Sequence, residues 1–276
     1  RNLGHDYLVD IEERYSETAR VTSPTPWDIM NELMQGGLGA GELGVVVAPA
    51  GIGKSWVLSA MGAYGISKGL NVVHYTLELN EAYVGLRYDS IFSGVEGQNL
   101  KYHKEEVMEK LFKLDGNLTI KYYPTKSCTV NTLSAHLKKV ITFGGKTDMV
   151  LVDYADIMRD VHRTREVRHA LGNIYEDLRG LAGELQVPIW TASQANRSAL
   201  DEDVIEAGKI AESYAKIMVA DFVMSLSRKI EDKIGNTGRF HVIKNRFGPD
   251  GLTYPARINT NTVSYTHLRA HETDSY

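Results

Sequence analysis

ELGVVVAPAGIGKS, residues 42–55, is the stretch that decides the fold of this chain. It begins as an apolar run typical of a strand, turns through a glycine-containing loop, and continues into a helical pattern that reaches Gly69. This order is that of a P-loop, in which backbone N–H groups and the helix N-terminus attract phosphate. The sequence therefore predicts a nucleotide site. Its residues are Ala48, Pro49, Ala50, Gly51, Ile52, Gly53, Lys54, Ser55 and Trp56.

Two side chains of the P-loop carry its chemistry. Lys54 is expected to reach the β- and γ-phosphate oxygens of ATP, and the Ser55 hydroxyl is expected to ligate Mg²⁺. ATP and Mg²⁺ are therefore the expected ligands. The loop begins with Ala48 where the pattern has glycine, at a position that mainly sets the turn. The alternative, a glycine turn beside an exposed lysine, would require the loop and both flanks to match by chance.

Beyond the P-loop, short β-branched runs alternate with longer helical stretches, as in a parallel sheet wrapped by helices. Residues 167–186 repeat apolar side chains every third and fourth position and predict a helix with one buried face. Residues 239–258 carry turn signals and predict a hairpin at a sheet edge. The fold class is therefore α/β, with a mostly parallel central sheet flanked by helices and a C-terminal β-hairpin. The predicted strands are residues 45–48, 71–77, 118–123, 149–153, 187–193 and 221–227.

Polar residues end three of these strands, where a parallel sheet lines its ligand crevice. Asp153 ends MVLVD and is placed to hold Mg²⁺ through water, unless it only caps a turn. Glu78 ends VVHYTLE and could deprotonate an attacking water, unless it is a surface residue at a helix start. Gln194 ends PIWTASQ, where its amide could sense the γ-phosphate, unless it is an ordinary polar loop residue.

Composition and charge exclude several classes of protein. The 276 residues are 43% apolar and 24% charged, which is globular usage and not that of a disordered or fibrous chain. A net charge of −4 provides no global field for nucleic acid or membrane, so any polyanion site must be local. The single cysteine, Cys128, excludes an intrachain disulfide and a multi-cysteine zinc site. Without a membrane-spanning run or a signal peptide, we expect no membrane partner and a cytoplasmic location.

Five segments in this order resemble the ATPase domain of DnaB-family hexameric replicative helicases: APAGIGKS, HYTLEL, LVDYADI, PIWTASQANRS and IKNRFG. The resemblance covers roughly residues 20–260, and its spacing looks closest to the helicases of T-even-like phages. Alanine at the first P-loop position is common in that family. The resemblance implies a RecA-like P-loop NTPase core and an ATP-driven helicase motor that translocates on single-stranded DNA and unwinds duplex, in a phage protein of the host cytoplasm.

The same resemblance implies roles for individual residues. Lys54 and Ser55 would bind phosphate and magnesium, with Asp153 as the second magnesium residue. Glu78 would be the catalytic base and Gln194 the sensor.

It also assigns roles to Lys244 and Arg246, because the arginine of the family's KxRxG segment enters the ATP site of the adjacent subunit as a finger. That role requires a homo-oligomer, a head-to-tail ring that closes after six copies. The alternative for both residues is solvated charge on a hairpin.

The densest basic stretch of the chain is YADIMRDVHRTREVRH, residues 154–169. In RecA-like rings, the loops after this strand and after the Gln194 strand face the central channel. The DNA-contacting residues are therefore predicted to be Arg163, Arg165, Arg197 and Ser198. Because no aromatic follows Tyr154 in the first loop, we expect contact with the phosphate backbone rather than base stacking. The alternative is a solvated loop of mixed charge.

Both ends of the chain carry further expectations. Residues 1–22 are predicted to be a linker helix and its connection from a missing N-terminal domain, ahead of a RecA-like ATPase domain over residues 23–262. The apolar side of this helix either packs on its own domain or docks on a neighbouring subunit. It is formed by Tyr7, Leu8, Ile11 and Tyr15. Residues 263–276 resemble a translated sequencing-library adapter, so we expect an artefact that is disordered. The alternative is a genuine polar tail. His267 and His271 are accordingly not taken as metal ligands.

Two other functions stay open at this point. A RecA- or RadA-type recombinase shares the core but forms filaments, and a KaiC-like or loader-like module uses ATP to control assembly. A small-molecule P-loop kinase is disfavoured because no segment resembles a lid over an acceptor. A primase and a helicase loader are the further partners that the helicase interpretation suggests.

Overall fold

The computed structural model describes residues 4–16, 20–200, 202–209, 215–259 and 264–267 of the chain. Within these residues, a nine-stranded sheet has the order β11-β10-β9-β8-β3-β7-β6-β4-β5. The six strands from β8 to β5 are parallel, and β9, β10 and β11 are antiparallel to their neighbours. The predicted class, a mostly parallel α/β sheet with a C-terminal hairpin, is therefore confirmed.

The bounds of the strands agree with the predicted runs to within two residues. The strands of the large sheet are β3 (Leu43–Ala48), β4 (Asn71–Thr76), β5 (Asn117–Tyr122), β6 (Met149–Asp153), β7 (Ile189–Gln194), β8 (Phe222–Ser227), β9 (Thr237–Asn245), β10 (Thr253–Asn259) and β11 (Ser264–His267). A two-stranded sheet pairs β1 (Thr22–Ser23) with β2 (Leu38–Gly39).

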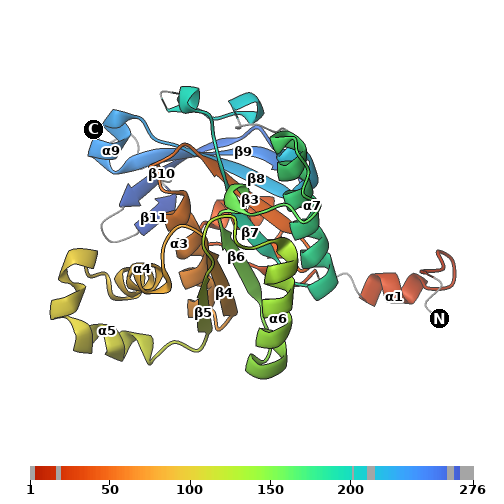
Figure 1. Cartoon of the computed structure of the whole chain (residues 1–276), viewed down its shortest axis with the longest axis horizontal. Helices are drawn as coiled ribbons and strands as arrows, with labels where there is room; N and C mark the ends of the chain where they lie inside the picture. Colours follow the sequence, from red (N-terminus) through yellow and green to blue (C-terminus); the bar gives the residue numbers. More distant parts are fainter. Residues whose placement is uncertain (1–3, 17–19, 201, 210–214, 260–263, 268–276) are drawn as a thin grey trace.

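Helices connect the strands and cover both faces of the sheet (Figure 1). The α-helices are α1 (Ile11–Ser16), α2 (Asp28–Leu33), α3 (Lys54–Ser67), α4 (Glu81–Ser93), α5 (Lys104–Leu111), α6 (Val130–Gly144), α7 (Val167–Leu185), α8 (Ala215–Val219) and α9 (Ile230–Gly235). The 3₁₀ helices are η1 (Gly97–Tyr102), η2 (Ala155–Ile157), η3 (Arg197–Ala199) and η4 (Ala207–Lys209). Among the described residues, none of these helices has the length and apolarity needed to cross a membrane.

Alternating side chains of the central strands divide the core into two layers. In β3, Val45 and Val47 pack with the apolar faces of α6 and α7, whereas Val46 and Ala48 pack with α3. Successive residues of a strand point to opposite faces, so one buried run contributes side chains to both layers of the core. The predicted apolar face of α7 is buried in the first layer, including Tyr175. This two-layer burial fixes the carboxyl ends of β3, β4, β6 and β7 at one edge, where the P-loop lies.

The C-terminal end differs from the expectation. The predicted hairpin forms as β9 and β10, but it is not the edge of the sheet, because Ser264–His267 pairs with β10 as β11. These four residues were expected to be disordered. The unpaired N–H and C=O groups along the open side of β10 offer a template that the following chain can occupy. Residue 263 and residues 268–276, with His271, lie outside the described residues, and the adapter origin of the segment stays a prediction.

The N-terminal helix is shorter than expected and stands apart from the sheet and its helices (Figure 1). It begins at Ile11, so Tyr7 and Leu8 lie in the turn before it. The four apolar side chains are 74%, 82%, 45% and 72% exposed at Tyr7, Leu8, Ile11 and Tyr15. The structure therefore contradicts the interpretation that this face packs on its own domain.

Candidate active site

The P-loop connects β3 to α3 in a conformation that its glycines allow. Gly51 and Gly53 have φ angles of 75° and 120°, in the region that favours glycine. At Gly51, no described atom lies within 4 Å of where a Cβ would stand, so the loop is open to a ligand there. The helix that follows begins at Lys54, directly after glycine, and a helix N-terminus of this kind binds anions.

The P-loop serine lies against the carboxylate at the end of β6. The Ser55 hydroxyl donates a hydrogen bond of 3.1 Å to Asp153 Oδ1, and Asp153 is 3% exposed. Burial raises the pKa of Asp153 to about 6, while the Ser55 hydrogen bond and the Arg87 charge oppose the shift. A hydroxyl and a carboxylate side by side are the oxygen ligands that Mg²⁺ prefers. These residues therefore fit a magnesium ion.

Lys54 is buried among acidic groups. Its side chain is 9% exposed, and burial lowers its pKa, an effect that the negative charges of Glu78, Asp153 and Asp156 oppose. The Lys54 ammonium also lies 5.2 Å from the centre of the Tyr154 ring. The neighbouring carboxylates favour the charged form of Lys54, which can then bind the negatively charged oxygens of a nucleotide phosphate.

Glu78 faces the same cavity as the P-loop. A pocket of about 410 Å³ is lined by Gly51, Ile52, Gly53, Lys54, Ser55, Trp56, Glu78, Arg87, Arg228 and Lys233. The backbone N–H of Leu77 donates to the carbonyl of Asp153 at 2.9 Å, which holds Glu78 beside the end of β6. The Tyr154 hydroxyl, hydrogen-bonded to Glu78, has its pKa raised to about 12, chiefly by burial. An exposed carboxylate opposite a phosphate loop is where a general base would stand.

Gln194 is directly opposite the first residue of the P-loop. The parallel register pairs Ala48 with Gln194, and the next N–H, of Ala195, donates to the Ala48 carbonyl at 3.1 Å. The N–H of Gln194 itself donates to Asp156 Oδ2 at 2.9 Å. The fold thus brings Gln194 together with Lys54, Ser55, Glu78 and Asp153 at one edge of the sheet.

Lys244 and Arg246 do not join this group. Strand β9 runs antiparallel to β8, so its end lies at the amino ends of the parallel strands, the edge opposite the P-loop. There, an Arg246 guanidinium nitrogen lies 2.7 Å from Asp221 Oδ1, and Lys244 Nζ donates to the Met218 carbonyl at 2.6 Å. Burial and the Arg246 charge lower the pKa of Lys244. Neither side chain can act on the nucleotide of its own chain from this position.

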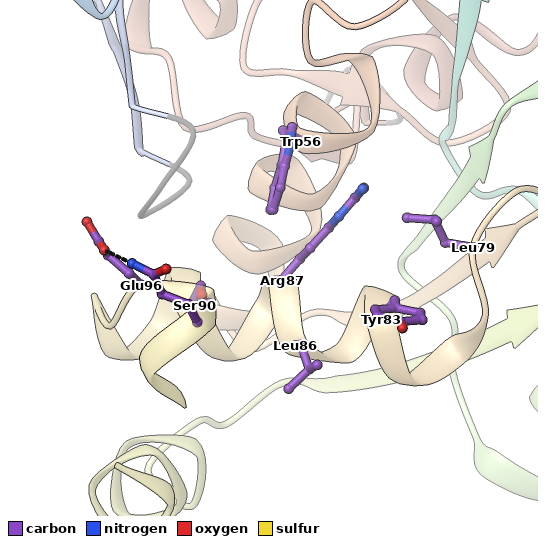
Figure 2. Close-up of a pocket in the computed structure, with 9 residues that line it drawn as sticks. Trp56, Leu79, Tyr83, Leu86, Arg87, Ser90 and Glu96 are labelled. Atoms are coloured by element: carbon purple, nitrogen blue, oxygen red, sulfur yellow. Dashed lines mark hydrogen bonds between the residues drawn. The ribbon is translucent and has the colours of Figure 1, made fainter. Parts of the chain in front are cut away.

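Three cavity residues were not predicted from the sequence: Arg87, Arg228 and Lys233. The Arg87 guanidinium lies 4.2 Å from the centre of the Trp56 ring, so α4 contributes a cation next to the start of α3. Figure 2 shows the Arg87 side chain extending from α4 toward Trp56 on α3. No spacing rule connects these basic residues to a P-loop, since only the folded chain brings α4 and the start of the α9 region to the cavity.

The predicted DNA-contacting residues lie in two loops beyond the ends of β6 and β7. Arg163 and Arg165 are exposed, and Arg163 has a φ of 54°. Asp160 organises this turn by accepting the N–H groups of His162 at 3.1 Å and Thr164 at 2.9 Å. Ser198 is exposed within η3, and the Arg197 side chain lies outside the described part of the chain.

The raised pKa of Asp153 predicts a stability cost. Because the folded pKa of about 6 exceeds the unfolded value of about 4, ionisation destabilises the fold as the pH rises from 4 to 6. We expect Asp153→Asn to raise the free energy of unfolding by about 3 kcal/mol at pH 8 and roughly half of that at pH 5. Denaturant unfolding at both pH values measures this. Asp250→Asn, at an exposed position, is the control and should show no gain at either pH.

Comparisons with known proteins agree on one family. A family model described as DnaB-like helicase C terminal domain matches residues 24–264. A DnaB-like replicative helicase of Enterobacteria phage T4 is 26% identical over 260 residues, which are 89% of this chain and 55% of that protein. Replicative DNA helicase DnaB of Geobacillus stearothermophilus is 25% identical over 269 residues, 90% of this chain and 58% of that protein. The chain thus spans about half the length of these curated relatives.

Two solved structures share the fold. One of them, described as an ATPase domain, has a TM-score of 0.79 and 17% identity, and the match covers 94% of this chain and 95% of that one. A DnaB-like replicative helicase described with its interactions with primase has a TM-score of 0.80 and 16% identity, with coverage of 96% and 68%. The expected RecA-like core is therefore confirmed at the level of the fold.

Proposed function

Because the chain belongs to the family of DnaB-like helicase C-terminal domains, we propose that it is the motor domain of a replicative DNA helicase. In this role it hydrolyses ATP, translocates on single-stranded DNA and separates the duplex. The observation that carries the proposal is the contact of Ser55 with Asp153 at 3.1 Å, beside a cavity that Ser55, Lys54 and Glu78 line. A phosphate loop, a magnesium-type oxygen pair and a candidate base meet in one place.

The residues divide the work of hydrolysis. Lys54 and the N–H groups of the P-loop hold the phosphates, and Glu78 orients a water and accepts its proton. Ser55 and Asp153 would hold Mg²⁺, which neutralises charge on the phosphate oxygens when bound. Gln194, fixed through its backbone to Asp156, responds to the presence of the γ-phosphate with its side-chain amide.

The experiment that tests the function is ATP hydrolysis by this chain, with and without single-stranded DNA, across a salt series. A DNA-dependent rate that weakens with salt is expected, because counterion release drives phosphate contacts. Hydrolysis that ignores DNA would point instead to the KaiC-like or loader-like module. The family match does not favour that module or a recombinase, and electron microscopy separates closed rings from recombinase filaments.

We propose that Arg163 and Arg165 contact the phosphates of the single strand. Replacing both by alanine should weaken binding of a poly-dT strand about tenfold and lower the salt slope by about 0.7 per lost contact. Fluorescence anisotropy at several salt concentrations measures both effects. Arg257→Ala removes an equally exposed arginine from β10 and should change neither. An unchanged slope in the double variant would mean that this loop is only a solvated surface.

The opposite placement of Arg246 and the P-loop favours a head-to-tail homo-oligomer. One edge of the sheet carries the P-loop, and the other edge carries an arginine suited to phosphate. Two such edges can meet only between subunits, and repetition of a heterologous contact gives a ring when the rotation between subunits closes. We propose a hexameric ring, in which Arg246 and Lys244 of one subunit complete the site of the next.

The exposed side of the α1 segment supplies a second contact between subunits. A cavity of about 640 Å³ between α3 and α4 is lined by Trp56, Leu79, Tyr83, Leu86, Arg87, Ser90, Glu96, Gly97 and Gln98 (Figure 2). An adjoining cavity of about 610 Å³ shares Leu86 and is lined by Val107, Met108 and Leu111 of α5. We propose that this apolar groove receives the α1 segment of a neighbouring copy, whose apolar side chains are otherwise left in water. A primase and a loader are further proposed partners, and one structural relative is described with a primase.

A further inference from the structure

A buried polar network lies beside the strand that ends in Gln194. Its centre is Asp156 in η2, three residues after Asp153. Asp156 Oδ2 accepts the N–H of Gln194 at 2.9 Å and the hydroxyl of Ser193 at 3.2 Å, and Oδ1 accepts the hydroxyl of Tyr175 at 2.8 Å. The carboxylate therefore fixes the main chain at the residue that we expect to sense the γ-phosphate.

The cation of this network comes from another element. Lys216 of α8 is 1% exposed, and its ammonium lies 3.0 Å from Asp156 Oδ1 and 3.4 Å from Ser193 Oγ. Lysine is almost never this buried unless paired, and a buried ion pair is often no more stabilising than apolar residues of the same volume. Stability alone therefore does not explain the Asp156–Lys216 ion pair, and the elements that it connects are the place to look for its role.

Helix α8 contacts the Lys244–Arg246 segment through its other end. The Met218 carbonyl, in the last turn of α8, accepts the Lys244 ammonium at 2.6 Å. Asp221, two residues beyond α8, pairs with Arg246 at 2.7 Å. One short helix and the residues that directly follow it thus touch both the sensor network and the two cations that we propose for the neighbouring subunit's site.

Building on the proposed function, we infer that Lys216 is a positioning residue whose ion pair with Asp156 ties the main chain at Gln194 to α8. A shift of Gln194 on loss of the γ-phosphate then moves α8, and with it the carbonyl and carboxylate that hold Lys244 and Arg246. Packed elements of this kind move between discrete arrangements rather than deform continuously. Lys216 itself touches neither nucleotide nor water in this scheme, since it acts through Asp156.

The test uses the full chain and three variants. Lys216→Met removes the buried cation, and Lys216→Met with Asp156→Asn replaces the ion pair by uncharged groups of similar size. Arg20→Met is the matched control, because Arg20 pairs with Glu42 at 2.6 Å just before β3, at the edge opposite the P-loop. Hydrogen exchange of backbone amides in residues 194–199 and 215–219 is followed with and without Mg²⁺ and a non-hydrolysable ATP analogue. The affinity for the analogue and the Tm are measured beside it.

In the unmodified chain, the analogue should slow exchange in residues 215–219 by about fivefold or more. Lys216→Met should lower the Tm by roughly 10 °C, because it leaves a buried carboxylate without its cation. It should still bind the analogue, but the nucleotide effect on residues 215–219 should disappear. The double variant should regain the Tm without regaining that effect, which separates positioning from a structural role. Arg20→Met should keep the effect whatever its Tm.

Three outcomes would overturn the inference while leaving the proposed function intact. They are a normal nucleotide effect in Lys216→Met, its return in the double variant, and its absence from an unmodified chain that binds the analogue. Failure of the unmodified chain to bind any ATP analogue would overturn the proposed function itself, and the inference with it.

Discussion

Replacing Glu78 by glutamine is expected to lower the kcat of ATP hydrolysis by about 10²–10⁴-fold, the usual contribution of a general base. Glutamine keeps the size of the side chain but cannot accept a proton from water. Because Glu78 is exposed and Lys54, Ser55 and Asp153 are untouched, nucleotide affinity and Tm should not change. Single-turnover hydrolysis at saturating ATP measures the effect, with and without single-stranded DNA.

Glu81→Gln is the matched control for this experiment. Glu81 is also an exposed glutamate at the start of α4, but its carboxylate accepts the N–H of Tyr122 at 3.0 Å, away from the P-loop. Its rate should stay within about twofold of the unmodified chain. A Glu78→Gln chain that hydrolyses ATP at the normal rate would show that a group other than Glu78 takes the proton.

Arg246→Ala is expected to lower hydrolysis by the assembled ring by about 10³-fold, the effect of removing an arginine finger. The expectation rests on the position of Arg246 at the edge opposite its own P-loop, where only a neighbouring subunit's nucleotide can be reached. Nucleotide binding by a single subunit should be unaffected. Arg246→Lys should recover little, because an ammonium lacks the planar fork that contacts two phosphate oxygens.

Mixing the two inactive variants tests the direction of this contact. A ring that contains both has interfaces in which an intact Glu78 from one subunit faces an intact Arg246 from the next. With equal, random mixing, about a quarter of the interfaces would be complete, and activity should return to a similar fraction. If Arg246 acted on its own chain's nucleotide, no mixture could restore activity. Mixed rings without activity would therefore contradict the proposal that Arg246 acts on the neighbouring subunit's nucleotide. Light scattering of each sample checks that rings have formed.

The parallel sheet could be predicted because each of its strands has a recognisable sequence pattern. Runs such as MVLVD are apolar on both faces, and they alternate with segments of helical period. The same logic placed Glu78, Asp153 and Gln194 together, since the carboxyl ends of parallel strands share one edge. Their roles remain predictions, but the sequence did lead us to expect that they lie with Lys54 at one edge of the sheet.

What the sequence could not provide depends on contacts between distant segments. Arg87 and Lys233 reach the nucleotide cavity only because the fold places α4 beside α3 and α9 beside β9, and no local pattern encodes these contacts. The Asp156–Lys216 pair joins residues sixty positions apart. From the sequence alone, a lysine in an apolar helix is expected to lie on the surface, and only the structure shows that Lys216 is buried. Strand β11 was missed for a different reason, because the open side of β10 offers pairing that composition does not reveal.

The contacts of the Asp221 carboxylate bear on the energetic penalty of releasing Arg246. It is 1% exposed and holds two arginines at once, Arg246 at 2.7 Å and Arg179 at 3.0 Å, and it also accepts the Leu43 N–H at 2.9 Å. If Arg246 leaves for a phosphate of the neighbouring subunit, as proposed above, Arg179 stays, so no bare anion is left in the protein interior. The departure and return of Arg246 can therefore be repeated at every turnover with a small energetic penalty. A reversible exchange of Arg246 between this carboxylate and a phosphate is what the proposed role in repeated ATP hydrolysis would require of such a contact.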